Sequence, residues 1–345
     1  MQFSQETILK LFIYGGSNSL LKDGWTAALA EKMPQTTVVN RSIGAATSLM
    51  ALFRLLTNTD EGPQPGDTVI WEYALNEAAH CARGYDAQIA LRNVTRFVDE
   101  CARRELKLVA AIFTPRAEEL ADARHPYYDQ LHDLLQARGV VSFDVSQAWR
   151  AATGAAHMPK SLFSNANHYA LDAGLTDLIT EGVISAMAGA CVPRGQAVTG
   201  AGGLAVRLFD EGTLYQNSLI SLPVAPNPST MVLDLQARVI GVVALAHPHS
   251  NCAIRLELTR LGHCGQWVNI STTTSGKSDK TILKAFSLEA AVGTAWEVAP
   301  GDSLNIQSLA EPGPVHGENH VRRNLPRLDA DPPSSFIGLV LERPA

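Results

Sequence analysis

Five short apolar runs alternate with segments of helical spacing in the first half of this chain, and this alternation constrains the fold more than any other feature. The predicted strands cover residues 8–15, 36–40, 67–74, 106–115 and 140–145. The predicted helices cover 19–33, 45–56, 85–105, 126–139 and 169–190. Such alternation is typical of a parallel sheet covered by helices on both faces. We therefore predict a three-layer α/β/α fold with a five-stranded parallel sheet.

The pattern changes after residue 192. A Pro/Gly-rich stretch over 193–203 predicts a linker. Beyond it, short β-rich runs such as VIGVVALA (239–246) are separated by turn signals. This spacing predicts a mainly antiparallel β-sandwich or jelly roll. The expected organisation is an α/β domain over 1–192, the linker, and a β-sandwich-like domain over 204–345.

The composition excludes several classes of protein. The formal net charge of −6 argues against a nucleic-acid binder. No apolar run approaches the roughly 20 residues that span a bilayer, and the N-terminal stretch MQFSQETILKLFIYGG lacks the basic start of a signal peptide. The five cysteines are scattered, which argues against a disulfide framework. We therefore expect a cytoplasmic protein with no membrane span and no nucleic-acid partner.

Polar stretches follow several of the predicted strands. In a parallel sheet the functional site lies at the carboxyl ends of the strands. The stretches at 15–19, 40–48, 73–77 and 164–174 bring a serine, a turn of small residues, an asparagine and a histidine to this edge. Acyl transfer needs such a set, because a serine hydroxyl requires a base and the tetrahedral intermediate requires hydrogen-bond donors for its oxyanion.

The order of Ser17, the Gly44-Ala45 turn, Asn76 and His168 resembles the SGNH hydrolases, also called GDSL-type esterases. The resemblance covers roughly residues 8–190, with GGS, ALNE and SNANH at the positions of the family's GDS, GxND and DxxH blocks. It implies hydrolysis or transfer of an ester, with Ser17 as nucleophile and His168 as base. The implied oxyanion donors are the Ser17 amide, the Gly44 or Ala45 amide and the Asn76 side chain.

The sequence departs from the family pattern at one important position. Asn165 stands where the family has the aspartate of its triad. An asparagine can orient an imidazole by a hydrogen bond, but it cannot stabilise the imidazolium by charge. In Ser-His-Asp proteases the change from Asp to Asn costs about 10⁴-fold in rate. Either a Ser17–His168 dyad works with other help, or the enzyme is slow. Further departures are Gly16, Ala74 and Glu77.

Each candidate also has an ordinary structural interpretation. For Ser17 the alternative is the role of a helix cap, and for Asn76 it is the cap of a turn. For His168 the alternative is a structural histidine, and for Gly44 it is a glycine required only by a positive φ. The HPH motif at 247–249 and the HGENH motif at 316–320 suggest zinc ligands, but Pro248 interrupts the first and no third ligand is evident. We expect no metal and no cofactor.

Two functions remain open at this point. The first is a serine esterase or O-acyltransferase acting on acetyl esters of a carbohydrate. In this hypothesis the partner is a small-molecule or carbohydrate ester, and the β-rich domain binds the sugar or forms a homo-oligomer. The second is a catalytically degenerate binding or scaffold protein, which the replacement at Asn165 favours.

Overall fold

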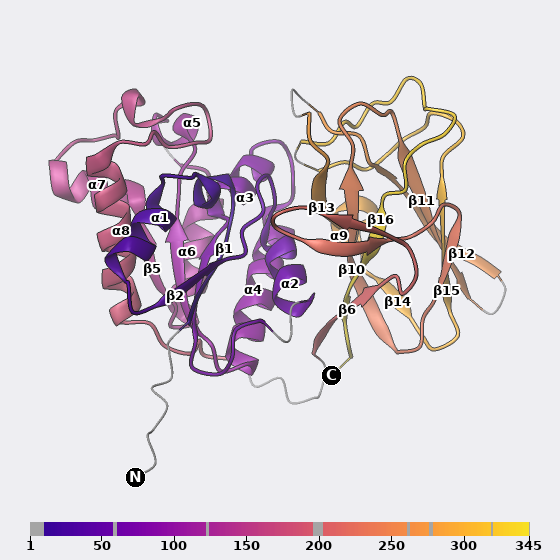
Figure 1. The fold of residues 1–345 in the computed structure, drawn as a ribbon, viewed down its shortest axis with the longest axis horizontal. Coiled ribbons are helices and arrows are strands. Elements are labelled where there is room, and N and C mark those ends of the chain that lie inside the picture. The colour runs from indigo at the N-terminus through magenta and orange to yellow at the C-terminus, as the bar shows by residue number, and fades with distance from the viewer. Residues whose placement is uncertain are drawn as a thin grey trace, which may run out of the picture. The chain divides into compact units, whose positions relative to one another are not determined.

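The structure is a computed structural model that describes residues 10–57, 61–121, 124–195, 203–260, 263–275, 279–318 and 320–344. The chain divides into two compact units, Met1–Ala197 and Val198–Ala345 (Figure 1). Most of the predicted linker, and the first two residues of the first predicted strand, lie outside the described residues. Each unit is described by itself below.

A five-stranded sheet forms the centre of the first unit, and all of its strands are parallel. The strand order is β2-β1-β3-β4-β5. The strands are β1 (Lys10–Gly15), β2 (Thr37–Asn40), β3 (Thr68–Glu72), β4 (Lys107–Ile112) and β5 (Val141–Asp144). The central strands β1, β3 and β4 are buried almost throughout, because helices cover both faces of the sheet. The predicted α/β fold is confirmed.

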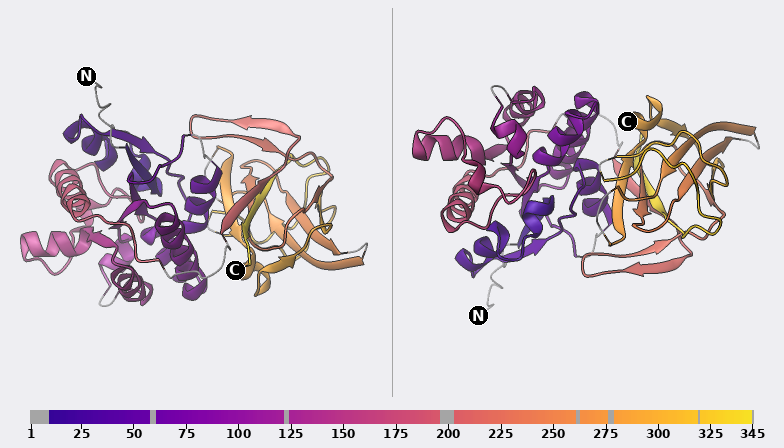
Figure 2. Two further views of the ribbon diagram at one scale, coloured as in Figure 1. Left: turned by 90° about the horizontal axis from the view of Figure 1, so that it is seen from below. Right: turned by 90° about the horizontal axis from the view of Figure 1, so that it is seen from above.

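Two groups of helices enclose the sheet (Figures 1 and 2). On one face, α1 (Trp25–Lys32), α7 (Val145–Thr153) and α8 (Ala173–Ala188) contribute to one apolar core or pack against its members. On the other face lie α2 (Ser48–Thr57), α3 (Ala74–Cys81), α4 (Ala87–Arg103) and α6 (Tyr127–Ala137), which pack against one another. The short helices η1 (Ser17–Leu20), α5 (Arg116–Glu119) and η2 (Lys160–Leu162) lie in the connections.

Side-chain caps fix where several helices begin. Asp86 accepts a hydrogen bond from the Gln88 amide at the start of α4, and Asp172 accepts one from the Leu175 amide at the start of α8. Both are preferred N-cap residues, since their carboxylates satisfy amides that have no partner within the helix. The cap at Asp172 matters for the site, because α8 begins directly after the loop that carries His168.

The structure differs from the predicted elements in the connections. The helix expected over 19–33 is two helices, η1 and α1, because the chain turns between Leu21 and Gly24. In the first unit, α3, α5 and α7 have no counterpart among the predicted helices. Helix α7 follows β5 without an intervening turn, and Asp144 both ends the strand and caps the helix.

Two antiparallel sheets build the second unit. One has the order β13-β10-β16-β6, with β14 also paired to β10, and the other has the order β12-β11-β15-β9. The strands of the first sheet are β6 (Leu204–Leu208), β10 (Ala237–Ala246), β13 (Ile282–Ser287), β14 (Trp296–Val298) and β16 (Phe336–Glu342). The strands of the second are β9 (Ser229–Val232), β11 (Ala253–Arg260), β12 (His263–Ser271) and β15 (Ser303–Ser308).

Apolar side chains from both sheets meet in one core. Val242 and Leu339 come from the first sheet, and Leu256 and Leu304 come from the second. This is the arrangement of a β-sandwich. A separate two-stranded ribbon, β7 (Thr213–Gln216) with β8 (Ser221–Val224), and the short helix α9 (Leu288–Val292) complete the unit (Figure 2). The mainly antiparallel β-rich architecture expected for the second half of the chain is confirmed.

Within the part of the chain that the structure describes, none of the helices combines the length and the apolar character needed to cross a bilayer.

Candidate active site

The four polar stretches singled out in the sequence meet at the carboxyl edge of the parallel sheet. Ser17 is the first residue of η1 and comes two residues after β1 ends. Gly44 and Ala45 follow β2, and Asn76 lies in the first turn of α3, which follows β3. His168 lies in the loop before α8. The N-cap position of η1 belongs to Gly16 and has no side-chain cap bond, so Ser17 does not cap this helix.

Ser17 and His168 are in direct contact although 151 residues separate them. The Oγ atom of Ser17 lies 2.6 Å from Nε2 of His168. Both residues are partly exposed. Burial lowers the pKa of His168 from its ordinary value, because desolvation disfavours the charged imidazolium. The imidazole is therefore neutral at pH 7, as a general base must be.

Asn165 contacts the other nitrogen of the ring, and its orientation is fixed by the backbone. Its Oδ1 accepts hydrogen bonds from the amides of Asn167 and His168, each at 3.0 Å. Its Nδ2 consequently faces Nδ1 of His168 at 2.8 Å. An amide nitrogen only donates, so Nδ1 is the acceptor and the neutral ring carries its proton on Nε2. In this tautomer Nε2–H donates to Ser17 and has no lone pair with which to remove the serine proton.

The residues expected to bind an oxyanion lie beside Ser17. A Cβ atom added at Gly44 would lie 3.5 Å from the Cβ of Ser17. Ala45 has a φ of +56°, a left-handed conformation that favours glycine. This conformation makes Ala45 the better match to a glycine-containing motif. Gly44 has no positive φ. The alternative explanation, that position 44 requires glycine for its backbone conformation, is therefore wrong.

The Asn76 amide reaches this turn from α3. Its Nδ2 donates to the carbonyl of Ala46 at 2.6 Å. A Cβ atom at Gly16 would lie only 2.9 Å from the same Nδ2. Glycine at position 16 therefore leaves room for the amide beside the serine turn. A primary amide has two N–H groups, so one bond to Ala46 leaves a second donor for an oxyanion.

Asn18 holds the histidine loop against the serine turn, and its role was not predicted. Its Nδ2 donates to the Asn167 carbonyl at 2.9 Å, and its Oδ1 accepts from the Tyr169 amide at 3.0 Å. The residue is 3% exposed, so both bonds are shielded from water. We name these two bonds the Asn18 clasp. The sequence signal was limited to an asparagine next to the candidate serine, which is equally typical of a turn.

Glu72 lies beneath the serine turn and was not predicted either. Its Oε2 accepts hydrogen bonds from the Gly16 amide at 2.9 Å and from the Ser19 hydroxyl at 2.6 Å. Burial raises the pKa of this carboxyl to about 7, against which the two hydrogen bonds act. The available signal was a charged residue at the end of the apolar run TVIWE.

Tyr169 ties the histidine loop to the end of β4. Its hydroxyl accepts a hydrogen bond from the Thr114 amide at 3.0 Å, and its ring stacks on Phe113. The Arg116 amide also donates to the Ala166 carbonyl at 3.0 Å. The loop that carries His168 is therefore held by the elements that follow both β1 and β4.

Other acidic and metal-ligating candidates have structural roles or no visible role. Glu77 is buried away from Ser17, where it accepts hydrogen bonds from the Ser48 amide and the Tyr127 hydroxyl. Asp144 caps α7 and pairs with Arg124 and His132. Among the described residues, His, Cys, Asp and Glu side chains do not gather in groups of three or more that could hold a metal ion.

Comparisons with known proteins show which solved structures share this fold. No family model matches the sequence, and no curated protein matches it. Among solved structures, the chain is similar to a two-domain esterase active on acetylated mannans, at 10% identity and a TM-score of 0.61. The match covers 98% of this chain and 92% of that one, so the two-domain fold is shared along nearly the whole length.

Two further solved structures match only about half of the chain. An α/β hydrolase, LAE5, from the metagenome of Lake Arreo, Spain, has 17% identity and a TM-score of 0.44, covering 52% of this chain and 95% of its own. A lipolytic protein of the G-D-S-L family from Veillonella parvula DSM 2008 has 9% identity and a TM-score of 0.43, covering 51% and 97%.

Proposed function

We propose that this chain is a serine esterase of the SGNH type that removes acyl groups, acetyl above all, from a carbohydrate. The observation that carries the proposal is the 2.6 Å contact between the Ser17 hydroxyl and the His168 imidazole. It joins a nucleophile to a base at the edge of a parallel sheet where such sites lie. The Asn76 amide and the turn at 44–45 adjoin the serine and are suited to the oxyanion.

The reaction proceeds in two steps. Nε2 of His168 removes the proton of Ser17 while Oγ attacks the acyl carbonyl, and the carbonyl oxygen becomes an oxyanion. The oxyanion accepts hydrogen bonds from Asn76 Nδ2 and from backbone amides of the turn. The imidazolium then gives its proton to the departing sugar oxygen, which leaves an acyl-serine. Water, or a sugar hydroxyl in a transferase, takes the acyl group in the second step with the same base.

Asn165 makes the first step slow in this chain. The base tautomer needs the proton on Nδ1, which must then face an acceptor. To present Oδ1 to the ring, the Asn165 amide must rotate and give up its bonds from the amides of Asn167 and His168. Each such bond contributes about 1 kcal/mol. The active arrangement is therefore a minor population of the site.

The substrate class rests on the shared two-domain fold. The similar protein is active on acetylated mannans, and it carries a second domain as this chain does. An acetylated mannan is thus the first substrate to test.

A test of the nucleophile uses Ser17→Ala. The variant should lose the acetate-releasing activity on acetylated mannan by at least about 10³-fold, and it should no longer be labelled by a fluorophosphonate. Ser142→Ala, on an exposed position of β5, is the matched control and should behave like the wild type. Equal acetate release by Ser17→Ala and the wild type would refute the proposal.

A degenerate binding protein is the second candidate, and the proton on Nε2 of His168 favours it. The two candidates differ in one measurement. A wild type that resists the fluorophosphonate, together with an Asn165→Asp variant that reacts, would identify a site that has lost its activity through this one residue.

A further inference from the structure

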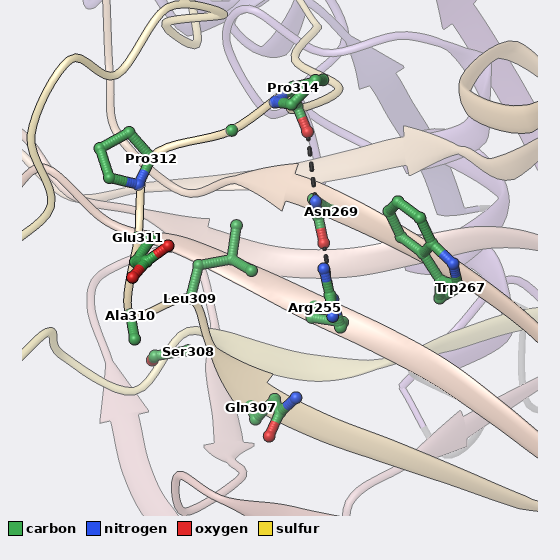
Figure 3. A pocket seen from close by; sticks show the side chains of 11 residues that line it. Arg255, Trp267, Asn269, Gln307, Ser308, Leu309, Ala310, Glu311, Pro312 and Pro314 are labelled. Carbon is green, nitrogen blue, oxygen red and sulfur yellow. Dashed lines mark hydrogen bonds between the residues drawn. The ribbon is translucent and has the colours of Figure 1, made fainter. Parts of the chain in front are cut away.

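The second unit has a cleft that the proposed reaction does not use. It lies on the sheet β12-β11-β15-β9, between the sheet and the segment 308–314, and has a volume of about 480 Å³ (Figure 3). This size falls within the range of ligand sites in proteins. Its strand residues Arg255, Trp267, Asn269 and Gln307 lie on the face opposite the core, because their neighbours Ile254, Val268 and Ile306 point into the core.

The polar groups of the cleft are held in place before any ligand binds. Arg255 lies directly across from Asn269 on one side and from Gln307 on the other. Asn269 accepts a hydrogen bond from Arg255 Nε at 3.0 Å, and its Nδ2 donates to the Pro314 carbonyl at 3.2 Å (Figure 3). Asn269 is 7% exposed, so it fixes both the arginine and the wall of the cleft. Such preorganisation lowers the cost of binding.

Trp267 stands at the side of the cleft with a large exposed surface. It is 54% exposed and is the one aromatic among the exposed large apolar side chains of the described residues. The Arg255 guanidinium lies over its ring at 4.7 Å from the centroid, which restrains the indole. Leaving a tryptophan in water is unfavourable, so an exposed and restrained one is typical of a binding surface.

The charges of the cleft favour a neutral ligand. It contains one cation, Arg255, and one carboxylate, Glu311, together with the amides of Asn269 and Gln307 and the hydroxyl of Ser308. A phosphate or an acidic chain would meet Glu311 without a second cation. A saccharide meets all of these groups, because its hydroxyls both donate and accept hydrogen bonds while the C–H face of its ring packs on an aromatic surface.

We infer that this cleft binds a neutral saccharide chain, with one sugar ring against Trp267 and its hydroxyls on Arg255, Asn269 and Gln307. The cleft is formed by residues of the second unit, whereas Ser17 and His168 belong to the first. It deepens the proposed action on a carbohydrate ester, but its binding does not require that reaction.

The experiment measures binding by the full chain in the Ser17→Ala background, so that no substrate is consumed. The probes are deacetylated β-mannan, β-xylan, β-glucan and starch, run in affinity gels and then titrated as hexasaccharides by calorimetry. At least one should be bound, and Trp267→Ala should weaken that binding by about tenfold or more. Because Trp267 is exposed, its fluorescence should also shift when the saccharide is added.

Val232→Ala is the matched control. Val232 is 61% exposed on β9 of the same sheet and does not line the cleft. Its affinity for the saccharide should lie within about twofold of that of the Ser17→Ala parent. The inference fails if none of the four polysaccharides is retarded, or if Trp267→Ala binds as well as Val232→Ala. It also fails if Trp267→Ala converts an oligomer to a monomer without changing the affinity, since the tryptophan then covers a second copy. Acetate release by the wild-type protein, which retains Ser17, tests the proposed function independently of these binding results.

Discussion

At the scale of single residues, the sequence predicts which side chains meet but not how one of them is oriented. Ser17 is predicted from its position after a strand and His168 from its position before the last predicted helix, and the structure brings them into contact. The orientation of Asn165 depends on the amides of Asn167 and His168, which point at its oxygen only in the folded loop. Asn18 and Glu72 were missed for a similar reason, because their partners lie far away along the chain.

Restoring a carboxylate at position 165 should raise the activity. In Asn165→Asp, one carboxylate oxygen still accepts hydrogen bonds from the amides of Asn167 and His168. The other oxygen accepts a hydrogen bond from Nδ1–H of His168, so Nε2 has a lone pair with which to take the serine proton. We expect kcat/KM to rise between about 10²- and 10⁴-fold. The carboxylate also favours the imidazolium and raises the pKa of His168, which burial now lowers. At low pH the base is protonated and the rate falls. The midpoint of this acidic limb of the pH–rate profile should therefore move to higher pH.

Asn167→Asp is the matched control for that change. It adds the same charge to the same loop, and Asn167 contributes its backbone carbonyl and amide to the hydrogen bonds of the site. It should change kcat/KM by less than about threefold, because the new carboxylate would be partly exposed and would make no hydrogen bond to the imidazole. A rate for Asn165→Asp equal to that of the wild type would show that the tautomer does not limit the reaction.

At the scale of elements, the apolar periodicity of the sequence predicted the long helices and the buried strands. It did not predict elements that lack such a periodicity. All eight residues of α3 are buried, including the polar Asn76, Glu77 and His80, so this two-turn helix lacks the apolar and solvent-exposed faces that mark an amphipathic helix. Helix α7 follows β5 directly, so no turn residues separate the two elements. Strand β7 is mostly exposed and lacks the apolar alternation that marks a half-buried strand.

Helix α8 approaches the sheet closely at one glycine, and an alanine there should destabilise the first unit. A Cβ atom at Gly182 would lie 2.0 Å from the ring of Phe143 in β5. Overpacking of this kind costs about 1–3 kcal/mol. We expect Gly182→Ala to lower the melting temperature by several degrees in calorimetry.

Gly174→Ala, in the first turn of the same helix, is the control for this prediction. Its new Cβ would meet only Asp172 Oδ1, at 3.4 Å. The melting temperature of that variant should stay close to that of the wild type. Combining Gly182→Ala with Phe143→Leu should recover part of the loss. If Gly182→Ala melts like the wild type, the contact between α8 and β5 is looser than described.

At the scale of the whole molecule, the two units carry buried ionisable groups with opposite effects. In the first unit, burial raises the pKa of Glu77 from 4.5 to about 7. In the second, burial lowers the pKa of Lys284 from 10.5 to about 8, partly offset by Glu318. The native first unit therefore binds more protons than the unfolded chain between pH 4.5 and 7. The native second unit binds fewer between pH 8 and 10.5.

The free energy of unfolding should follow these proton differences. The first unit should lose up to about 3 kcal/mol through Glu77 as the pH rises from 4.5 to 7. In Glu77→Gln the free energy of unfolding should no longer fall by this amount between pH 4.5 and 7, because a neutral amide does not titrate. Urea denaturation at several pH values, followed by fluorescence, measures the slope. Lys284→Met should leave this acidic slope unchanged and should abolish the gain in stability between pH 8 and 10.5. An unchanged acidic slope in Glu77→Gln would mean that the carboxyl titrates normally.

The Asn18 clasp has a consequence for the order in which the molecule is made. The serine turn is synthesised about 150 residues before the loop that holds His168, and the clasp joins segments 149 and 151 residues apart. Contacts of such long range form late in folding. During synthesis the strands of the sheet can leave the ribosome one after another, yet the contact between Ser17 and His168 cannot form until Tyr169 has emerged and docked. In the proposed enzyme, Ser17 therefore becomes reactive only after the loop that carries His168 has docked.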